Sequence, residues 1–381
     1  MAKKYFIHTF GCQQNTADSE RLASFYQSRG FMSAETLEKA DILVLNTCVV
    51  RDRAEERVYG IIRSLRTRLK EKSPRIIVTG CLIGAAARIS GGQMMKRLTA
   101  RLSDVEFLPM EDVGFEYAPE RAVGKMASIV VSNGCNNYCA FCIVPFSRGK
   151  ERSRPFEEIL LEVKKAVAGG YTEVLLLGQN VNSYGADFLA EKIKKKEAYV
   201  LSDGTEVKPV MVKHLNRHRI PTLFPHLLES IARIPELKKI SFISSNPWDF
   251  SDELIGVIAR YKNIDRLLHL PVQSGSNEVL KRMNRWYTCE EYLALIDRIR
   301  KLIPGVRFMT DVIVGFPGET EEQFQETIDL AKRIGFEKAF IAWYSPRPGT
   351  HAAKNFKDDI SIHEKKRRFK ELDRVIFKRK G

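Results

Sequence analysis

Short apolar stretches alternate with segments of helical composition along most of this 381-residue chain. Such alternation predicts parallel β-sheets whose strands are connected by helices. In the first part of the chain, we expect strands at 4–9, 41–45 and 75–79 and helices at about 17–29 and 51–72. These elements predict a Rossmann-like domain with a parallel sheet over residues 1–122. The stretch 103–126 is expected to be a linker, because Pro109, Gly114, Pro119 and Gly124 stand among its charged residues.

A second alternating pattern follows this linker. Strands are expected at 127–132, 172–177, 239–243, 266–270, 307–314 and 339–343. Helices are expected at about 156–168, 222–234, 251–261, 288–302 and 320–334. Six βα units predict a partial (β/α)6 barrel over residues 123–350, with its chemistry at the carboxyl ends of the strands. The fold class is therefore α/β, and a basic helical segment, 351–381, is expected to end the chain.

Residues 186–220 interrupt this rhythm and predict a surface insertion. The insertion is basic through Lys192, Lys194, Lys195, Lys196, His214, Arg217, His218 and Arg219. Contact with RNA and a solvated charged hairpin are both open interpretations of this segment.

The formal net charge is +15, which favours phosphate polymers as partners, although a soluble basic protein is the alternative. No run of 18 apolar residues and no leader-like N-terminus is present, so we expect a cytoplasmic protein with no membrane partner. Seven cysteines in a long cytoplasmic chain favour metal or redox chemistry over a disulfide framework.

Three of these cysteines, Cys135, Cys139 and Cys142, are spaced closely enough to hold one metal cluster on a single loop. Thiolates are soft ligands that suit iron–sulfur clusters or zinc. Structural zinc usually takes four ligands, so three favour a [4Fe-4S] cluster with one iron open to a substrate. A zinc knuckle with a distant fourth ligand and a purely structural cluster are the alternatives.

Three further cysteines, Cys12, Cys48 and Cys81, each follow an expected strand of the N-terminal domain. The carboxyl ends of parallel strands meet at one edge of a sheet, so these cysteines are expected to converge there. Gly11 and Gly80 precede two of them and would let the backbone approach a cluster. Three ordinary buried cysteines are the alternative. Cys289 is expected to be structural, at the start of a helix capped by Thr288 and Glu291.

The stretch from Gly134 to Pro155, with its CxxxCxxC motif, resembles the radical-SAM methylthiotransferase family, and within it the tRNA 2-methylthioadenosine synthases. Further matching motifs are Gly11–Asn15, Asn46–Cys48, Leu177–Asn182, Leu270–Ser276, Val314–Glu319 and Ser345–Thr350. The resemblance implies one [4Fe-4S] cluster on Cys135, Cys139 and Cys142 and an auxiliary one on Cys12, Cys48 and Cys81. No catalytic residue beyond these cluster ligands is expected.

The reaction that the resemblance implies uses S-adenosylmethionine twice. One molecule methylates a sulfur on the auxiliary cluster, and a second is reductively cleaved to a 5′-deoxyadenosyl radical. The radical removes the hydrogen from C2 of N6-isopentenyladenosine at position 37 of tRNA, and the methylthio group joins that carbon. Cofactor chemistry is needed because an aromatic C–H is not acidic enough for a protein base. A flavodoxin- or ferredoxin-type protein is the expected electron donor.

Several residues near the strand ends are expected to bind S-adenosylmethionine. They are Phe141, Gln179, Asn180, Ser244, Ser245, Gln273, Ser274 and Asp311. Asp311 lies on the fifth strand of the expected barrel, where its carboxylate could accept hydrogen bonds from ribose hydroxyls. A turn or capping role is the alternative for each of these residues.

A basic run after the cysteine loop, Arg148, Lys150, Arg152 and Arg154, is expected to contact the tRNA anticodon loop. A radical site needs its adenine splayed out of such a loop. A solvated face at the start of a helix is the alternative, and Arg148 or Arg152 could instead contact the cofactor.

Departures from the family pattern bear on the substrate more than on the chemistry. The usual C-terminal RNA-binding β-barrel is absent from these 381 residues, which suggests a truncated sequence or a short member. His351 stands where proline is common, and Ser245-Asn246-Pro247 differs mildly from the usual form. Alternative substrates are N6-threonylcarbamoyladenosine in tRNA and an aspartate of ribosomal protein S12. A non-catalytic iron–sulfur RNA-binding or electron-transfer protein is the alternative of another class.

Overall fold

The chain divides into two compact units in a computed structural model. The first contains Met1–Gly124 and Ile143–Lys150, and the second contains Lys125–Cys142 and Glu151–Gly381. The structure describes residues 3–49, 54–69, 74–115, 117–121, 124–189, 199–201, 203–214 and 218–377. The chain thus leaves the second unit after Cys142 and returns to it at Glu151, which the sequence did not indicate. Domain boundaries at residues 122 and 350 stay a prediction.

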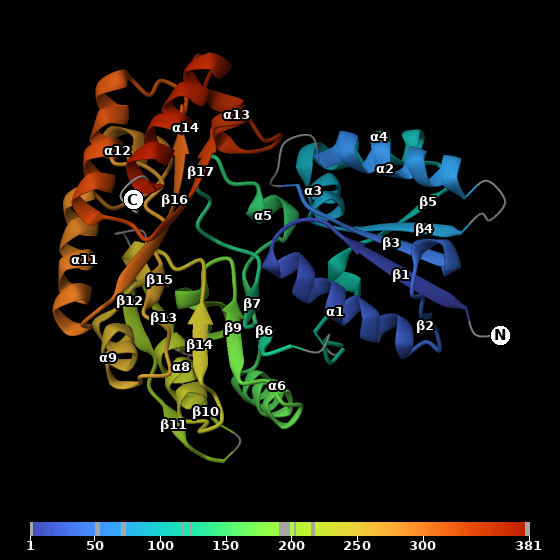
Figure 1. Cartoon of the computed structure of the whole chain (residues 1–381), viewed down its shortest axis with the longest axis horizontal. Helices are drawn as coiled ribbons and strands as arrows, with labels where there is room; N and C mark the ends of the chain where they lie inside the picture. The colour runs from blue at the N-terminus through green and yellow to red at the C-terminus, as the bar shows by residue number, and fades with distance from the viewer. Residues whose placement is uncertain are drawn as a thin grey trace. The chain divides into compact units, whose positions relative to one another are not determined.

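The first unit contains a five-stranded parallel sheet in the order β2-β1-β3-β4-β5 (Figure 1). Its strands are β1 (Lys4–Thr9), β2 (Met32–Ser33), β3 (Ile42–Thr47), β4 (Arg75–Gly80) and β5 (Val105–Leu108). The three expected strands are present, and the Rossmann-like character is confirmed. The expectation of a linker is wrong for β5, which pairs with β4. Its four residues, between charged residues and Pro109, were too few for a periodic signal.

Helices cover both faces of this sheet (Figure 1). They are α1 (Gln13–Gln27), α2 (Ala54–Arg68), α3 (Cys81–Arg88) and α4 (Gln93–Arg101). Alternate side chains of a strand point to opposite faces, so Leu43 and Leu45 pack towards α2, α3 and α4 while Ile42 and Val44 pack towards α1. A short helix, α5 (Val144–Ser147), belongs to the same unit and packs against α3.

The second unit contains a partial barrel of six parallel strands, in two sheets with the orders β14-β9-β6 and β15-β16-β17. The strands are β6 (Met126–Val130), β9 (Glu173–Leu177), β14 (Lys239–Phe242), β15 (Leu267–His269), β16 (Arg307–Val314) and β17 (Lys338–Trp343). A parallel bridge between Ile240 and Ile264 connects β14 to the residues before β15. The prediction of a partial (β/α)6 barrel is confirmed.

The helices of this unit lie outside its strands (Figure 1). They are α6 (Phe156–Ala168), α8 (Phe224–Ala232), α9 (Asp252–Arg260), α10 (Asn277–Arg282), α11 (Cys289–Leu302), α12 (Glu321–Ile334), α13 (His351–Asn355) and α14 (Ile362–Phe377). The expected capping box is present at α11, where Thr288 and Glu291 bond each other's backbone N–H groups. Cys289 is buried there and donates to the Gly275 carbonyl at 2.9 Å, as a structural cysteine should. The C-terminal helix α14 packs on β17 through Phe369 and Trp343.

The insertion forms two antiparallel pairs, β10 (Tyr199–Val200) with β11 (Glu206–Val207) and β12 (Val210–His214) with β13 (His218–Thr222). Lys192, Lys194, Lys195, Lys196 and Arg217 lie outside the described residues. None of the described helices is long and apolar enough to cross a membrane.

Candidate active site

The loop of Cys135, Cys139 and Cys142 begins just after β7 (Ser132–Asn133), a short strand that follows β6. Hydrogen bonds within the second unit hold its backbone. The amide of Gly134 donates to Oε1 of Gln179, and the amide of Ala140 donates to the Met283 carbonyl at 2.8 Å. Gln179 therefore shapes the cysteine loop, a role that the sequence did not indicate.

The three thiols of this loop lie within electrostatic reach of one another. Burial raises the pKa of Cys135 well above its ordinary value, and the negative charges of Cys142, Glu151 and Cys139 raise it further. Metal binding would offset this cost, since thiolates bind as the deprotonated form. Among the described residues, no three metal-binding side chains converge tightly enough for a single ion. Cysteine thiolates are the ligands that hold iron–sulfur clusters.

Arg285 lies beside the loop and was missed by sequence reasoning. It is buried, and its Nη1 lies 3.6 Å from Sγ of Cys139. Its Nη2 donates to the Pro271 carbonyl at 2.9 Å, and its Nε donates to the Tyr287 hydroxyl at 3.0 Å. Burial opposes its charge, but Tyr287 and Cys139 outweigh burial and raise the pKa of Arg285. A permanent cation therefore faces a predicted cluster ligand.

Polar side chains collect after the barrel strands, as the sequence predicted. Asn180 is buried after β9, and its Nδ2 donates to Asp249 at 2.8 Å. The side-chain oxygens of Asn180, Ser245 and Gln273 are buried and have no hydrogen-bond partner among the described residues. Buried polar atoms normally have partners, so these orphaned atoms fit a polar ligand such as S-adenosylmethionine.

Two of these strand ends are backbone outliers. Ser244 has φ of +65° and Gln273 has φ of +72°, in the left-handed region that non-glycine residues rarely adopt. In the described chain, the other two such residues are Tyr138, in the cysteine loop, and Asn284, which bonds the Tyr138 carbonyl at 2.9 Å. Strained backbone clusters at functional sites, and all four residues belong to this one region.

A histidine that sequence reasoning missed connects two predicted site residues. The amide of Ser244 donates to Nδ1 of His269 at 2.9 Å. This bond leaves the proton on Nε2, which donates to Oδ1 of Asp311 at 3.1 Å. Asp311 is about one-third exposed, so it keeps acceptor capacity for a ligand. His269 could not be found by motif, because it ends β15 one residue before the Leu270–Ser276 motif begins.

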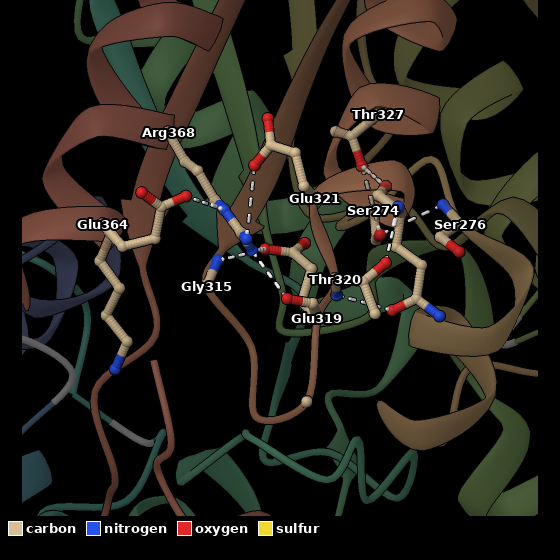
Figure 2. A network of polar contacts seen from close by, with 12 residues as sticks. Ser274, Ser276, Gly315, Glu319, Thr320, Glu321, Thr327, Glu364 and Arg368 are labelled. Atoms are coloured by element: carbon tan, nitrogen blue, oxygen red, sulfur yellow. Dashed lines mark hydrogen bonds and ion pairs between the residues drawn. The ribbon is translucent and has the colours of Figure 1, made fainter. Parts of the chain in front are cut away.

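Ser274 is held by hydrogen bonds around its own turn, and its contact with the cofactor stays a prediction. It is fully buried, accepts from the Ser276 amide at 3.2 Å and lies 3.4 Å from the Thr327 hydroxyl (Figure 2). It therefore stabilises the turn itself. Phe141 is half-buried and packs against the apolar cluster around Ala140, Met283 and Phe316, and its contact with the cofactor stays a prediction.

The turn Val314–Glu319 is fixed by the C-terminal helix, as Figure 2 shows. Oε2 of Glu319 accepts from the Gly315 amide at 2.6 Å and from Nη1 of Arg368 at 2.8 Å. Arg368 also donates to Glu364 at 2.8 Å within α14. A Cβ on Gly315 would lie 2.5 Å from Cγ of Lys365, so the helix requires glycine there. The sequence matched this turn to a motif but gave no sign of its partner helix.

In the first unit, the three remaining cysteines lie at the carboxyl edge of the sheet, as predicted. Cys12 is the N-cap of α1, Cys48 follows β3, and Cys81 begins α3 directly after β4. A Cβ on Gly11 would lie 2.9 Å from Cβ of Cys48, so only glycine allows this approach. Cys12 donates to Oδ1 of Asn15 at 3.3 Å.

The ionisation of Cys81 depends on its charged neighbours at this edge of the sheet. Burial raises the pKa of Cys81 to about 11; the Arg148 cation lowers it, while the charges of Cys48, Asp18 and Cys12 raise it. Three thiols that repel one another as thiolates fit a shared metal cluster, which neutralises their charge.

The basic run after the cysteine loop is corrected in two places. Arg148 and Arg154 are buried, and each pairs with a buried carboxylate, Asp18 at 2.8 Å and Glu162 at 2.5 Å. These pairs keep both side chains inside the protein, away from an RNA backbone. Lys150 and Arg152 are exposed, and their contact with RNA stays a prediction.

Comparisons with known proteins agree with this geometry. The Radical SAM superfamily matches residues 129–331, and the uncharacterized protein family UPF0004 matches residues 4–97. The tRNA-2-methylthio-N(6)-dimethylallyladenosine synthase of Thermotoga petrophila is 40% identical over 97% of this chain and 80% of its own length. The enzymes of the same name from Caldicellulosiruptor saccharolyticus and Clostridium botulinum strain Okra are each 39% identical over 98% of the chain, covering 78% and 81% of their own lengths.

Solved structures show the same fold at low identity. The radical S-adenosylmethionine methyltransferase TsrM from Kitasatospora setae, with cobalamin and a [4Fe-4S] cluster bound, has a TM-score of 0.60 at 14% identity. The alignment covers 93% of this chain and 77% of TsrM. The cobalamin-dependent radical enzyme OxsB, with S-adenosylmethionine bound, has a TM-score of 0.52 at 11% identity over 100% of this chain and 56% of its own.

The barrel and its three-cysteine loop therefore define a radical-SAM protein, for which an iron–sulfur cluster and S-adenosylmethionine are the cofactors. The identity of about 40% to curated relatives over nearly the whole chain narrows this class to one family. The chain belongs to the family of the tRNA-2-methylthio-N(6)-dimethylallyladenosine synthases.

Proposed function

We propose that this chain is a tRNA methylthiotransferase. It inserts a methylthio group at C2 of N6-isopentenyladenosine at position 37 of tRNA, with S-adenosylmethionine as methyl donor and radical source. The observation that carries this proposal is a three-cysteine site in each unit, combined with about 40% identity to these synthases over nearly the whole chain. Because the substrate is tRNA, the place of action is the cytoplasm.

Two [4Fe-4S] clusters complete the proposed enzyme, one on Cys135, Cys139 and Cys142 and one on Cys12, Cys48 and Cys81. The mutual charge effects among the cysteines of each unit support both assignments. When bound, the first cluster supplies the electron that cleaves S-adenosylmethionine, and the second supplies the site of the sulfur to be transferred. A flavodoxin- or ferredoxin-type protein is the proposed electron donor.

The chain's own residues would bind and orient S-adenosylmethionine. The amide oxygens of Asn180 and Gln273 would accept hydrogen bonds from its polar groups, and the Ser245 hydroxyl would donate or accept one. His269 holds one oxygen of Asp311, so the other is oriented for ribose hydroxyls. Arg285 would balance the thiolate charge beside Cys139.

The anticodon loop of tRNA is the proposed macromolecular partner. Its adenine must leave the stack to reach a radical site, and single-stranded loops permit this. The formal charge of +15 and the exposed Lys150 and Arg152 support attraction to a phosphate backbone.

Nucleoside mass spectrometry of tRNA tests the proposed reaction. A strain without the gene should lose 2-methylthio-N6-isopentenyladenosine, and complementation with the full chain should restore it. Complementation with Cys135→Ala should fail, whereas Cys289→Ala, the matched control at the structural cysteine, should succeed. Loss of the methylthiolated threonylcarbamoyl nucleoside, or of the modified aspartate on ribosomal protein S12, would redirect the substrate assignment. Unchanged tRNA in the deletion strain would overturn it.

Iron content separates the two clusters. Anaerobically reconstituted protein should hold about eight iron atoms per chain, as two [4Fe-4S] clusters require, and about four after Cys12, Cys48 and Cys81 are replaced by alanine. The reconstituted unmodified protein should release 5′-deoxyadenosine when it is supplied with S-adenosylmethionine and a reductant. About four iron atoms in the unmodified chain would exclude the second cluster. Absence of 5′-deoxyadenosine would favour a non-catalytic iron–sulfur protein.

A further inference from the structure

The segment Ile143–Lys150, which follows the cysteine loop of the second unit, is part of the first unit. Its helix α5 packs so closely on α3 that a Cβ on Gly84 would lie 1.9 Å from the Ser147 carbonyl oxygen. Arg88 of α3 also donates to the Phe146 and Ser147 carbonyls at 3.4 Å. The backbone just before Arg148 is therefore fixed against the first turn of the helix that Cys81 begins.

The side chain of Arg148 reaches α1, the other helix that a cysteine begins. Its Nη2 lies 2.8 Å from Oδ2 of Asp18, which is completely buried. Asp18 also pairs with Arg21 at 2.5 Å. Asp18 therefore pairs with two arginines in this buried group.

This buried ion-pair group lies next to the three-cysteine site of the first unit. Asp18 lies in the second turn of α1, after Cys12, and Gly84 lies in the first turn of α3, after Cys81. Arg148 is therefore held between the N-terminal parts of both helices. Burial opposes the charge of Arg148, but Asp18, Cys81 and Cys12 outweigh it and raise its pKa. Cys81 in turn experiences Arg148 as the cation that lowers its pKa.

We propose that Arg148 is the buried counterion of the cluster on Cys12, Cys48 and Cys81, that Asp18 positions it there, and that it raises the reduction potential of this cluster. The proposal rests on the second cluster of the proposed function. Reduction adds a negative charge to a site that already holds three thiolates. A fixed cation in a poorly solvated environment stabilises that added charge. Arg148 thus acts on the cluster through its positive charge. Its ion pair with Asp18 holds this charge in place as well as connecting the segment after α5 to α1.

The test uses the full chain with Cys135, Cys139 and Cys142 replaced by alanine, so that only the cluster of the first unit is present. Iron content and an EPR-monitored potentiometric titration are measured after anaerobic reconstitution. Arg148→Met should shift the midpoint potential to more negative values, and Asp18 should keep Arg21 as its partner in this variant. Arg148→Lys should retain most of the parent potential. Asp18→Asn should shift it to more positive values, because it removes a negative charge next to Arg148.

The matched control is Arg88→Met, which removes another arginine that ties α5 to α3 but pairs with Glu111. It should leave the potential at the parent value. A purely mechanical role predicts that Arg148→Met and Arg88→Met lower iron content together and that no variant moves the potential; that result would overturn the proposal. Equal shifts in Arg148→Met and Asp18→Asn would also overturn it. If Arg148→Met holds no iron, the shift of the midpoint potential in Asp18→Asn tests the proposal: a positive shift supports it, and no shift or a negative one overturns it. A parent protein without iron would refute the second cluster itself, a distinct outcome.

Discussion

At the scale of single residues, polar contacts between residues far apart in the sequence shape the candidate active site. Arg285 reaches Cys139, and His269 reaches both Ser244 and Asp311, across long separations in sequence. Gln179 holds the Gly134 amide in the same way. These contacts set the shape and charge of the site around Cys135, Cys139 and Cys142, which their spacing in the sequence already identifies as candidate metal ligands.

We predict that Arg285→Met weakens the cluster of the second unit. Losing a group that hydrogen-bonds a ligand typically lowers metal affinity or activity by about 10- to 100-fold. Formation of 5′-deoxyadenosine and iron content should both fall, whereas the exposed control Arg298→Met on α11 should match the parent. Parent-like values for Arg285→Met would show that this arginine only fills space.

At the scale of elements, close packing makes particular residues obligatory. Gly84 lets α5 lie against α3, and Gly315 lets α14 lie against the Val314–Glu319 turn. Arg368 and Glu364 of α14 then complete the bonds of that turn. The C-terminal helix is therefore part of the second unit's architecture rather than a basic appendage.

Gly84→Ala should destabilise the first unit by about 1–3 kcal/mol, since an added methyl in a tight contact forces backbone shifts. Gly60→Ala is the matched control, because Gly60 also lies in a helix but has no atom within 4 Å of its added Cβ. This control should be neutral or up to about 1 kcal/mol stabilising, owing to the higher helix propensity of alanine. Urea unfolding measures both, and equal stability of the two variants would contradict the close approach.

Glu364 should make stability depend on pH. Hydrogen bonds from Arg367, and then from Arg368, lower its pKa from 4.5 to about 2 despite partial desolvation. A lowered pKa means that its ionised form stabilises the folded chain above pH 4.5 and that this contribution is lost as pH falls towards 2. The stability difference between the parent and Glu364→Gln should therefore shrink between pH 4.5 and pH 2 in cluster-free protein. A constant difference in urea unfolding would refute this assignment.

At the scale of the whole molecule, the net charge of +15 is available for a polyanion only where its cations are exposed. Burial removes Arg148 and Arg154 from that role and leaves Lys150 and Arg152. The same basic run thus divides between internal ion pairs and surface cations.

Replacing Lys150 and Arg152 by alanine should weaken tRNA binding and reduce its salt dependence. The slope of log K against log salt is negative, and each lost phosphate contact on a single strand reduces its magnitude by about 0.7. Fluorescence anisotropy with labelled tRNA across a salt series measures this slope. Arg298→Ala on α11, which removes one exposed cation elsewhere, is the control, and an unchanged slope in the double variant would exclude these two contacts.

The sequence by itself determined the order of strands and helices and the cysteine loop, because both depend on local spacing. It also identified the cysteines after successive strands, since parallel strands bring their carboxyl ends to one edge. Sequence reasoning missed β5, whose short stretch lacks a periodic signal, and the segment Ile143–Lys150 within the first unit.

Only the tertiary structure decided what Arg148, Arg154 and Ser274 do. Each has a residue type that suits a ligand. Arg148 and Ser274 are buried against partners far away in the chain, and Arg154 is buried against Glu162 on the helix that follows it. Burial and pairing depend on packing between distant elements, which residue type and local spacing do not encode. The physical reason is that a cation's role depends on what surrounds it: in water Arg148 would attract phosphate, but beside Asp18 and the cysteines of the first unit it acts as an internal counterion.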